Sequence, residues 1–306
     1  MKITFDHMKK FSSDGAVLLK GAFREFVEGA RNAIEENIRT PSWRERTYRP
    51  DDGGQAFFQD YVVWNKFDGY RNLVKNSEMP SIAAHLMNSD TARIFHDHIL
   101  VKEPGNSVVT PWHQDQPYYL CEGEQTISFW VPLDYIPRER TIEYIAGSHA
   151  WGKNFKPQRF DGTDLFEDDK SEVVPDIENS RDQFNILGWE MEPGDAVAFH
   201  FRTLHGAPAN SSNSRRRVIS VRWVGDDARY AKRLGPTSPA FPELNYKHGD
   251  PFDGDEFPIL FHKPKINYKL LNLIIYCRVS LLFPTDNALT QVTNICLANL
   301  VNESLP

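Results

Sequence analysis

The spacing of apolar residues predicts helices and one strand near the start of the chain. Phe5–Phe23 combines a short helical stretch with the apolar strand Ala16–Leu19. A helix is expected at about residues 79–89, just before the strand Ala92–Val101. Another helix, over Phe23–Ile38, is favoured by apolar side chains at helical spacing: Phe26, Val27, Ala30, Ala33 and Ile34.

Strand patterns dominate the second half of the chain. The turn Glu192–Asp195 precedes the apolar run Ala196–Phe199, and the chain then reaches His205. After the polar turn Asn210–Ser214, residues 215–223 form a β-branched run typical of a strand. We therefore expect His205 and Arg216 to lie near facing ends of two consecutive antiparallel strands and to share one pocket.

Four residues along these strands have side chains suited to iron chemistry. His113 and Asp115 lie in an extended stretch after an apolar strand, where alternate side chains point the same way and can bind one ion. With His205 they supply two imidazoles and one carboxylate, the set that suits non-haem Fe(II) and leaves three adjacent positions open. Arg216, eleven residues after His205, has a planar guanidinium that can bind the far carboxylate of a 2-oxo acid.

Other histidines compete for the metal but lack a complete ligand set. His96 and His98 share one face of a strand, yet nothing else completes a site for them, so we expect packed and hydrogen-bonded side chains. His149 is expected to be structural or to support a ligand. His200 lies five residues before His205, an odd offset that places it on the opposite face.

The arginines near Arg216 are predicted to play no part in binding the cosubstrate. Arg215 and Arg217 flank Arg216 and should point away from the pocket. Arg222 has the same strand parity as Arg216, but it lies six residues further on, roughly 20 Å by strand rise.

At this point the chain resembles the phytanoyl-CoA dioxygenase family of Fe(II)/2-oxoglutarate oxygenases, over roughly residues 5–262. The resemblance implies a mainly β fold with a double-stranded β-helix (jelly-roll, cupin-like) core and flanking N-terminal helices. It is carried by these motifs: Lys102-Glu103-Pro104-Gly105, Thr110-Pro111-Trp112-His113-Gln114-Asp115, Ile145-Ala146-Gly147-Ser148-His149, Pro193-Gly194-Asp195, His205-Gly206-Ala207 and the strand of Arg216.

The resemblance also implies roles for individual residues. His113, Asp115 and His205 would bind Fe(II), Arg216 would bind 2-oxoglutarate, and Trp130 would form a wall of the 2-oxoglutarate pocket. Some relatives have Ser two residues after the second His; Ala207 stands there in this chain, so that hydroxyl contact is not expected.

The implied reaction consumes O2 and converts 2-oxoglutarate to succinate and CO2 while a C–H bond of the substrate is hydroxylated. Ascorbate is a candidate reductant. Halogenating relatives have a small residue where this chain has Asp115, so the carboxylate favours hydroxylation.

Two domain-level expectations follow. Residues 1–262 would form the oxygenase domain, and residues 263–306 a C-terminal extension of unknown role. An amphipathic helix that packs on the body or on a second subunit, and so supports a homodimer, is one interpretation of the extension; a loosely attached tail is the other.

Two further segments are predicted to lie at the active site. The long acidic segment of residues 153–182 is expected to be a mobile active-site loop. Residues 42–70 are rich in aromatic side chains, which either cap the barrel as core or form a lid over the substrate.

The composition of the chain limits the kinds of partner and substrate that it is expected to bind. With 306 residues, 40% of them hydrophobic, the chain has ample material for a core, and its net charge of −7 disfavours nucleic acid and anionic membranes. Three separated cysteines argue against a disulfide framework, and we find neither a signal-peptide pattern nor a long apolar run. We expect a cytoplasmic protein. The basic cluster Arg215–Arg217 is the only evident one for coenzyme A phosphates, so a small free metabolite is favoured over an acyl-CoA substrate.

Three functional hypotheses remain open from the sequence. The oxygenase hypothesis uses the metal set and Arg216 together. A cupin-type metalloenzyme outside the oxygenases would have no need for Arg216 in register. A catalytically silent metal- or ligand-binding jelly-roll protein would more commonly have lost one of the three ligands, and all three are present.

Overall fold

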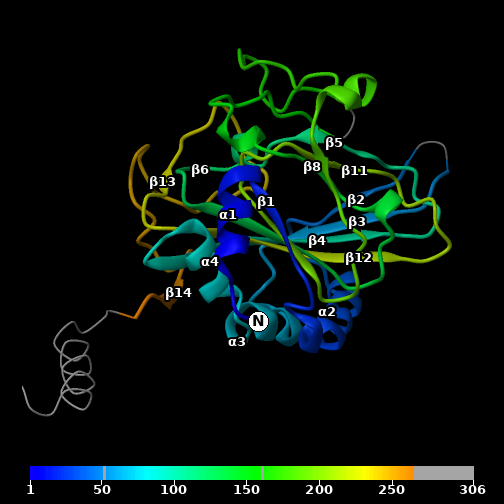
Figure 1. The fold of residues 1–306 in the computed structure, drawn as a ribbon, viewed down its shortest axis with the longest axis horizontal. Coiled ribbons are helices and arrows are strands. Elements are labelled where there is room, and N and C mark those ends of the chain that lie inside the picture. Colours follow the sequence, from blue (N-terminus) through cyan, green and yellow to red (C-terminus); the bar gives the residue numbers. More distant parts are fainter. Residues whose placement is uncertain (51–52, 160–161, 265–306) are drawn as a thin grey trace, which may run out of the picture. The chain divides into compact units, whose positions relative to one another are not determined.

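Two antiparallel sheets pack face to face in the body of the protein (Figure 1). This computed structural model describes residues 1–50, 53–159 and 162–264. The larger sheet has the strand order β1-β10-β7-β12-β4-β3-β2, with β14 paired to β4, and the smaller has the order β5-β11-β8-β9. A short pair, β13 and β6, lies apart from both. This arrangement is the mainly β jelly roll that the sequence predicts.

The bounds of the elements are as follows. The helices are α1 (Phe5–Asp14), η1 (Arg24–Phe26), α2 (Val27–Arg39), α3 (Asp68–Asn76), α4 (Met79–Met87), η2 (Gln116–Tyr118), η3 (Arg138–Arg140), η4 (Ser148–Ala150) and η5 (Glu178–Gln183). The strands are β1 (Ala16–Leu19), β2 (Arg46–Tyr48), β3 (Phe57–Tyr61), β4 (Thr91–Lys102), β5 (Thr110–His113), β6 (Cys121–Glu122), β7 (Thr126–Pro132), β8 (Glu143–Ile145), β9 (Ile186–Leu187), β10 (Ala196–Phe199), β11 (His205–Ala207), β12 (Arg216–Val224), β13 (Arg229–Tyr230) and β14 (Ile259–His262).

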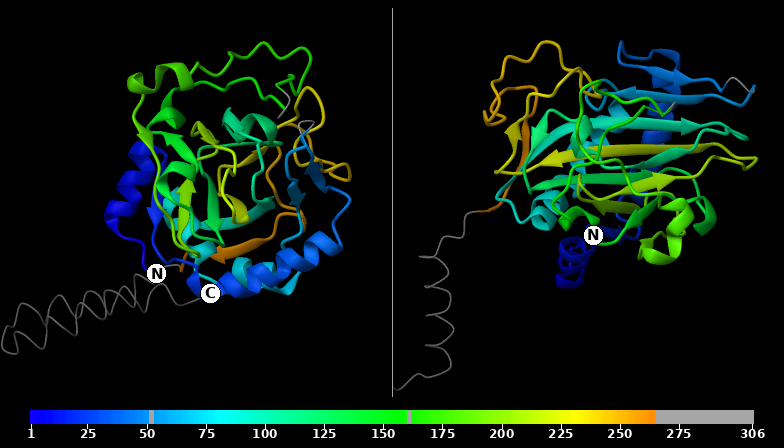
Figure 2. Two further views of the ribbon diagram at one scale, coloured as in Figure 1. Left: turned by 90° about the vertical axis from the view of Figure 1, so that its right-hand side faces the viewer. Right: turned by 90° about the horizontal axis from the view of Figure 1, so that it is seen from above.

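Helices α2 and α3 cover the outer face of the larger sheet (Figure 2). Helix α2 turns its small and aliphatic side chains inward, because they recur every three or four residues. The two helices approach closely at Gly29 and Gly69, where a Cβ on Gly69 would lie 1.9 Å from the carbonyl oxygen of Gly29. Glycine is therefore required at this crossing.

Most predicted elements of the first hundred residues are confirmed, with small shifts of their ends. The helix expected over Phe23–Ile38 begins at Val27 after a single 3-10 turn, and the expected helix at residues 79–89 is α4. Strand β1 has its predicted bounds, and it pairs with β10 at the edge of the larger sheet. Asn88, in the left-handed conformation with φ 51°, ends α4.

The expected pairing of the strands that carry His205 and Arg216 is wrong. Strand β11, with His205, belongs to the smaller sheet, whereas β12, with Arg216, lies in the middle of the larger sheet between β4 and β7. The polar turn between them carries the chain from one sheet to the other. His205 and Arg216 nevertheless line the same cavity, because the two sheets face each other across it.

Aromatic side chains of residues 42–70 lie partly in the core and partly along the cavity, while a lid over the substrate remains a prediction. Phe57 and Tyr61, on β3, line the cavity between the sheets. Trp43 is exposed. The remaining aromatic side chains in the buried core are Phe58, Trp64, Phe67 and Tyr70.

Residues 265–306 lie outside the described part of the chain, so the expectations for the extension after residue 262 remain predictions.

Candidate metal centre and cosubstrate pocket

His113 and His205 are direct partners on neighbouring antiparallel strands of the smaller sheet. Their rings lie 4.2 Å apart, centre to centre. Asp115 joins them: its Oδ1 atom lies 3.8 Å from the Nε2 atom of His113 and 3.8 Å from that of His205. One ligand atom from each of the three side chains lies within 4.8 Å of the others. The structure thus brings the three predicted ligands into one cluster.

Backbone carbonyls orient both imidazoles. The Nδ1 atom of His113 lies 2.8 Å from the carbonyl oxygen of Pro111, and that of His205 lies 2.9 Å from the carbonyl oxygen of Thr203. A proton on each Nδ1 satisfies these bonds and leaves the Nε2 lone pairs directed at the cluster. Burial lowers the pKa of His113, and it lowers the pKa of His205 to about 3. Both rings are therefore neutral at neutral pH, which is the form that binds metals.

Asp115 is held by groups on three segments. Strand β5 ends at His113, so strand alternation does not align Asp115 with it. Asp115 has helical backbone angles and directly precedes the 3-10 turn η2. Its backbone N–H donates to the carbonyl oxygen of Phe201 at 2.8 Å. The hydroxyl of Ser128 donates to Oδ2 at 3.0 Å, and an Nη2 atom of Arg222 lies 3.6 Å from the same oxygen.

These contacts leave Oδ1 to face the histidines. Burial is the largest single influence on Asp115 and opposes its ionisation, but Arg222, His205, His113 and a hydrogen bond from Tyr119 together outweigh it and hold the pKa of this carboxyl well below its usual range. Asp115 is therefore an ionised carboxylate, with one oxygen held by Ser128 and Arg222 and the other free for a metal.

The three donors fit Fe(II) by their chemistry. Two neutral imidazoles and one carboxylate, with ligand atoms converging from β5, the start of η2 and β11, form the facial set that non-haem Fe(II) oxygenases use. In the described residues no other group of three His, Cys, Asp or Glu side chains converges in this way.

Arg216 and Trp130 line the same cavity from the larger sheet. Arg216 is buried; its guanidinium donates to the carbonyl oxygens of Arg140 at 2.9 Å and Pro208 at 3.1 Å. Burial lowers the pKa of Arg216 to about 10, so the side chain remains charged at neutral pH. Ala207 faces this end of the cavity, where it offers no hydroxyl.

Lys102 is a second buried basic side chain at the Arg216 end of the cavity, and the sequence analysis did not single it out as a site residue. It lies opposite Arg216 in the strand register, and its ammonium donates to the carbonyl oxygen of Val108 at 2.6 Å. Burial lowers its pKa to about 6. Two features of the sequence could have indicated Lys102 as a site residue. It is the first residue of one of the motifs that carry the family resemblance, and it shares its strand face with His98.

The position of Arg222 differs from the expectation that it plays no part in the pocket. It lies six residues beyond Arg216, as the parity and spacing indicate, but it lines the same cavity and reaches Asp115. The cavity extends along β12, so residues of one parity line it from Arg216 to Arg222. Ser128 is the register partner of Arg222 on β7, which explains why both contact the same oxygen of Asp115.

The remaining histidines take separate positions. His98 lines the cavity, stacks on Tyr61 and has its Nε2 atom 3.0 Å from Oε1 of Gln59, whereas His96 is fully buried and packs edge-on against Tyr119. The Nε2 atom of His149 lies 3.2 Å from the carbonyl oxygen of Ser12, in keeping with a structural role. The Nε2 atom of His200 lies 2.9 Å from the carbonyl oxygen of Glu124, outside the cavity.

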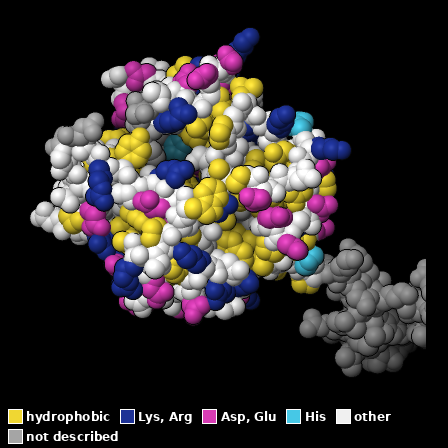
Figure 3. Space-filling model, turned by 180° about the vertical axis from the view of Figure 1, so that it is seen from behind, with side chains coloured by type: hydrophobic (Ala, Val, Ile, Leu, Met, Phe, Trp, Pro, Cys, Tyr) yellow, Lys and Arg dark blue, Asp and Glu magenta, His cyan; other side chains and the backbone are white. Residues whose placement is uncertain are grey.

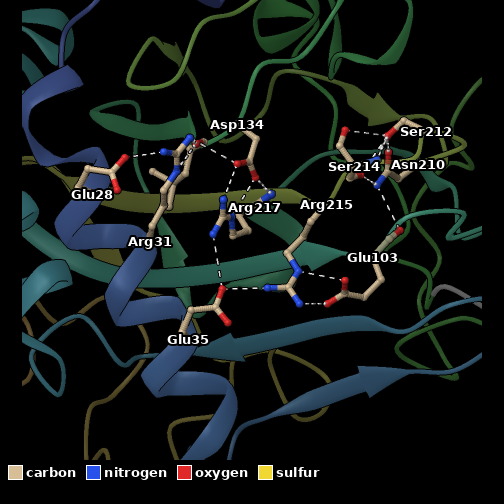
Figure 4. A network of polar contacts seen from close by, with 11 residues as sticks. Glu28, Arg31, Glu35, Glu103, Asp134, Asn210, Ser212, Ser214, Arg215 and Arg217 are labelled. Atoms are coloured by element: carbon tan, nitrogen blue, oxygen red, sulfur yellow. Dashed lines mark hydrogen bonds and ion pairs between the residues drawn. The ribbon is translucent and has the colours of Figure 1, made fainter.

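Arg215 and Arg217 point away from the cavity, as expected (Figure 4). Arg215 pairs with Glu35 at 2.8 Å and with Glu103 at 2.9 Å. Arg217 pairs with Asp134 at 2.7 Å. Glu35, on helix α2, pairs with both arginines, so the basic cluster that the sequence offered for coenzyme A phosphates is engaged in ion pairs.

Part of the long segment after residue 153 reaches the cavity. Lys156 and Gln158 line it, and the backbone of Gln158 exchanges two hydrogen bonds with the hydroxyl of Tyr118. Gln114 anchors the start of this segment through bonds to Lys153 and Phe155. Figure 3 shows a hollow in the surface with a histidine side chain at its floor and basic side chains beside it. The placement at the active site agrees with the prediction, while the mobility of the segment remains a prediction.

A jelly roll with a 2-His-1-carboxylate cluster and a buried arginine in one cavity defines the class of non-haem iron oxygenases. The family model "Phytanoyl-CoA dioxygenase (PhyH)" matches residues 11–218. The chain belongs to this family, as its motifs indicate.

Individual relatives are distant. A probable phytanoyl-CoA dioxygenase of Caenorhabditis elegans is 26% identical over 197 residues, which cover 62% of this chain and 59% of that protein. The peroxisomal phytanoyl-CoA dioxygenase of Homo sapiens is 20% identical over 248 residues, covering 74% of this chain and 70% of that protein. The match thus spans about three fifths of the worm protein.

Solved structures share the fold. The non-haem, 2-oxoglutarate-dependent carbocyclase SnoK from nogalamycin biosynthesis superimposes with a TM-score of 0.68 at 25% identity, covering 85% of this chain and 97% of that one. The enzyme EctD from S. alaskensis, crystallised with 2-oxoglutarate and 5-hydroxyectoine, has a TM-score of 0.61 at 18% identity, covering 81% and 85%.

Within residues 1–50, 53–159 and 162–264, no helix has both the length and the apolar character needed to cross a membrane.

Proposed function

We propose that this chain is an Fe(II)- and 2-oxoglutarate-dependent dioxygenase that hydroxylates an unactivated C–H bond of a small molecule. The observation that carries the proposal is one cavity that holds the three-residue cluster of His113, Asp115 and His205 together with buried, charged Arg216. A metal cluster alone would fit many enzymes, but a buried guanidinium with only carbonyl oxygens as hydrogen-bond partners fits a carboxylate cosubstrate.

Each residue has a defined role in this proposal. His113, Asp115 and His205 bind Fe(II), which supplies the chemistry of O2 activation driven by decarboxylation of 2-oxoglutarate to succinate. Arg216 binds the far carboxylate of the cosubstrate. Trp130, on the neighbouring strand β7, closes the wall beside it and excludes water. Ser128 and Arg222 keep one oxygen of Asp115 engaged so that the other faces the metal.

Hydroxylation is the outcome that we propose, and the relatives supply the alternative. Solved neighbours are described as a carbocyclase and an epimerase, so ring closure and epimerisation are the alternatives. Mass spectrometry of the product separates these outcomes, because hydroxylation adds an oxygen atom whereas ring closure removes two hydrogen atoms.

The experiment that tests the class is simple. Purified protein is incubated with Fe(II), 2-oxoglutarate and a crude metabolite extract, and succinate and oxygen-added products are measured. Ascorbate is included as a reductant. A cupin-type metalloenzyme outside the oxygenases, or a silent binding protein, would form no succinate above the level without iron.

Location and assembly are also proposed. We infer a cytoplasmic protein from the cysteine usage, and a homodimer formed through residues 263–306 is the assembly to test.

A further inference from the structure

Basic side chains outnumber acidic ones around the cavity. Among the described residues, one carboxylate lines it, that of Asp115, against four basic side chains: Lys102, Lys156, Arg216 and Arg222. Lys156 pairs with Asp164 at 3.1 Å. Burial lowers the pKa of Lys102 to about 6, so it is largely uncharged at neutral pH. Arg216 is assigned to 2-oxoglutarate, which leaves Arg222.

Asp115 does not balance Arg222 once the metal and cosubstrate are bound. The two positive charges of Fe(II) are offset by Asp115 and by the metal-bound carboxylate of 2-oxoglutarate, and Arg216 is offset by the other carboxylate. The charge of Arg222 is then left over in a fully enclosed position. A buried charge without a partner is costly, so the loaded cavity favours one more anion.

The surroundings of Arg222 can receive that anion. Its Nε atom donates to the hydroxyl of Tyr119 at 2.9 Å and its Nη1 atom to the carbonyl oxygen of Ser220 at 3.2 Å, which leaves N–H groups over. The hydroxyl of Ser220 faces the same cavity, is 1% exposed and has no hydrogen-bond partner among the described residues. A buried donor with no partner beside a guanidinium points to a ligand that carries oxygen atoms.

Neutral groups complete this end of the cavity. His98, the register partner of Ser220 on β4, stacks on Tyr61. Burial, and then the charge of Arg222, lowers the pKa of His98 well below its usual value. The side chains of His98 and Tyr61 both bind Oε1 of Gln59. Arg222 is therefore the charged group that a substrate meets there.

We propose that the substrate carries a single carboxylate, which binds to Arg222 and Ser220 at the Asp115 end of the cavity. This inference rests on the proposed function and names its substrate class. A guanidinium matches a carboxylate through two parallel hydrogen bonds. One leftover positive charge matches a monoanion and not the several phosphate charges of a coenzyme A thioester.

The test measures binding to protein loaded with Fe(II) and 2-oxoglutarate without oxygen. The probes are phenylacetate, 4-methylpentanoate and indole-3-acetate, each paired with its primary amide, and a metabolite extract from which the protein retains its own ligands. We expect at least one acid to bind roughly 30-fold or more tightly than its amide, which corresponds to the loss of one buried charge pair. We also expect the retained metabolites to be carboxylic acids.

Variants show which group holds the carboxylate. Arg222→Gln removes the preference for acids, Arg222→Lys restores part of it, and Ser220→Ala weakens it. Arg215→Gln, which removes a cation just before the same strand and outside the cavity, leaves it unchanged. Acids that bind Arg222→Gln as tightly as they bind the native protein would be bound by the metal, and this result overturns the proposal. Amides that bind the native protein as tightly as the acids also overturn it. So do retained metabolites that carry no carboxylate.

Loading with Fe(II) and 2-oxoglutarate is measured on the same samples. A native protein that takes up neither defeats the proposed function. One that takes up both without preferring carboxylates defeats only this inference.

Discussion

Lys102 and Arg216 lie opposite each other on β4 and β12, and both donate to the carbonyl oxygen of Pro208, at 3.4 and 3.1 Å. Among the described residues, neither side chain is paired with a carboxylate. Their other acceptors are the carbonyl oxygens of Val108 and Arg140 and the hydroxyl of Thr110. Two buried basic groups at one end of a cavity form a place for an anion. The energetic cost of burying them is offset when a carboxylate arrives.

Replacing Arg216 with Leu should raise the concentration of 2-oxoglutarate needed for turnover, with little change in metal affinity. Losing one partner of a buried charge pair costs about 2–5 kcal/mol, or roughly 30-fold and more. The matched control is Arg217→Leu, a neighbour on the outer face of the same strand. Titration of metal and cosubstrate separately gives the answer; a similar loss in both variants would argue against a specific carboxylate site.

Lys102 should make the metal-free protein more stable as the pH rises. Its pKa is about 6 in the folded protein and higher when unfolded, so between these values the unfolded chain binds a proton that the folded chain does not. The free energy of unfolding should therefore increase with pH above 6, by up to about 1.4 kcal/mol per pH unit relative to Lys102→Met.

The measurement is denaturant unfolding of both proteins at pH 7 and pH 9. Parallel pH dependences would show that Lys102 keeps its charge when folded.

Ser128→Ala should weaken metal binding without unfolding the protein. The hydroxyl is one of the two groups that hold Oδ2 of Asp115, and supporting contacts of this kind are typically worth about 10–100-fold in metal affinity. Competition with a chelator measures the change, and circular dichroism checks the fold. Unaltered affinity would mean that the contacts of Asp115 other than Ser128 are enough to orient it.

The sequence predicted that His113, Asp115 and His205 converge, because each stands in a recognisable local pattern. His113 and Asp115 are two residues apart, and Arg216 begins a long β-branched strand. It could not show that His205 and Arg216 belong to different sheets, since a polar turn between two strands is equally compatible with a hairpin and with a crossing between sheets.

Arg222 and Ser128 were missed for a different reason. Their roles depend on strand register: they are partners across β12 and β7, and no local pattern gives that pairing. Parity places Arg222 on the face of Arg216, but its spacing of six residues predicts a position far from the cosubstrate. The cavity extends along that strand, so the same spacing separates two ends of one pocket.

A chain that ends at Lys263 should retain 2-oxoglutarate turnover. The three proposed metal ligands and the proposed cosubstrate residues precede residue 217, and residues 1–263 contain both sheets. Solubility or oligomeric state is expected to change, as measured by size-exclusion chromatography with light scattering. A folded, iron-binding but inactive truncation would place part of residues 264–306 in the catalytic machinery.

Succinate formation by the native protein and by single-ligand variants is the most direct test of the metal site. The native protein should convert 2-oxoglutarate to succinate only when Fe(II) is present. Asp115→Ala and His205→Ala should each abolish this conversion and greatly weaken iron binding, with the fold intact, because each removes one of three protein ligands. Near-normal, iron-dependent succinate formation in either variant would contradict the assignment of the site.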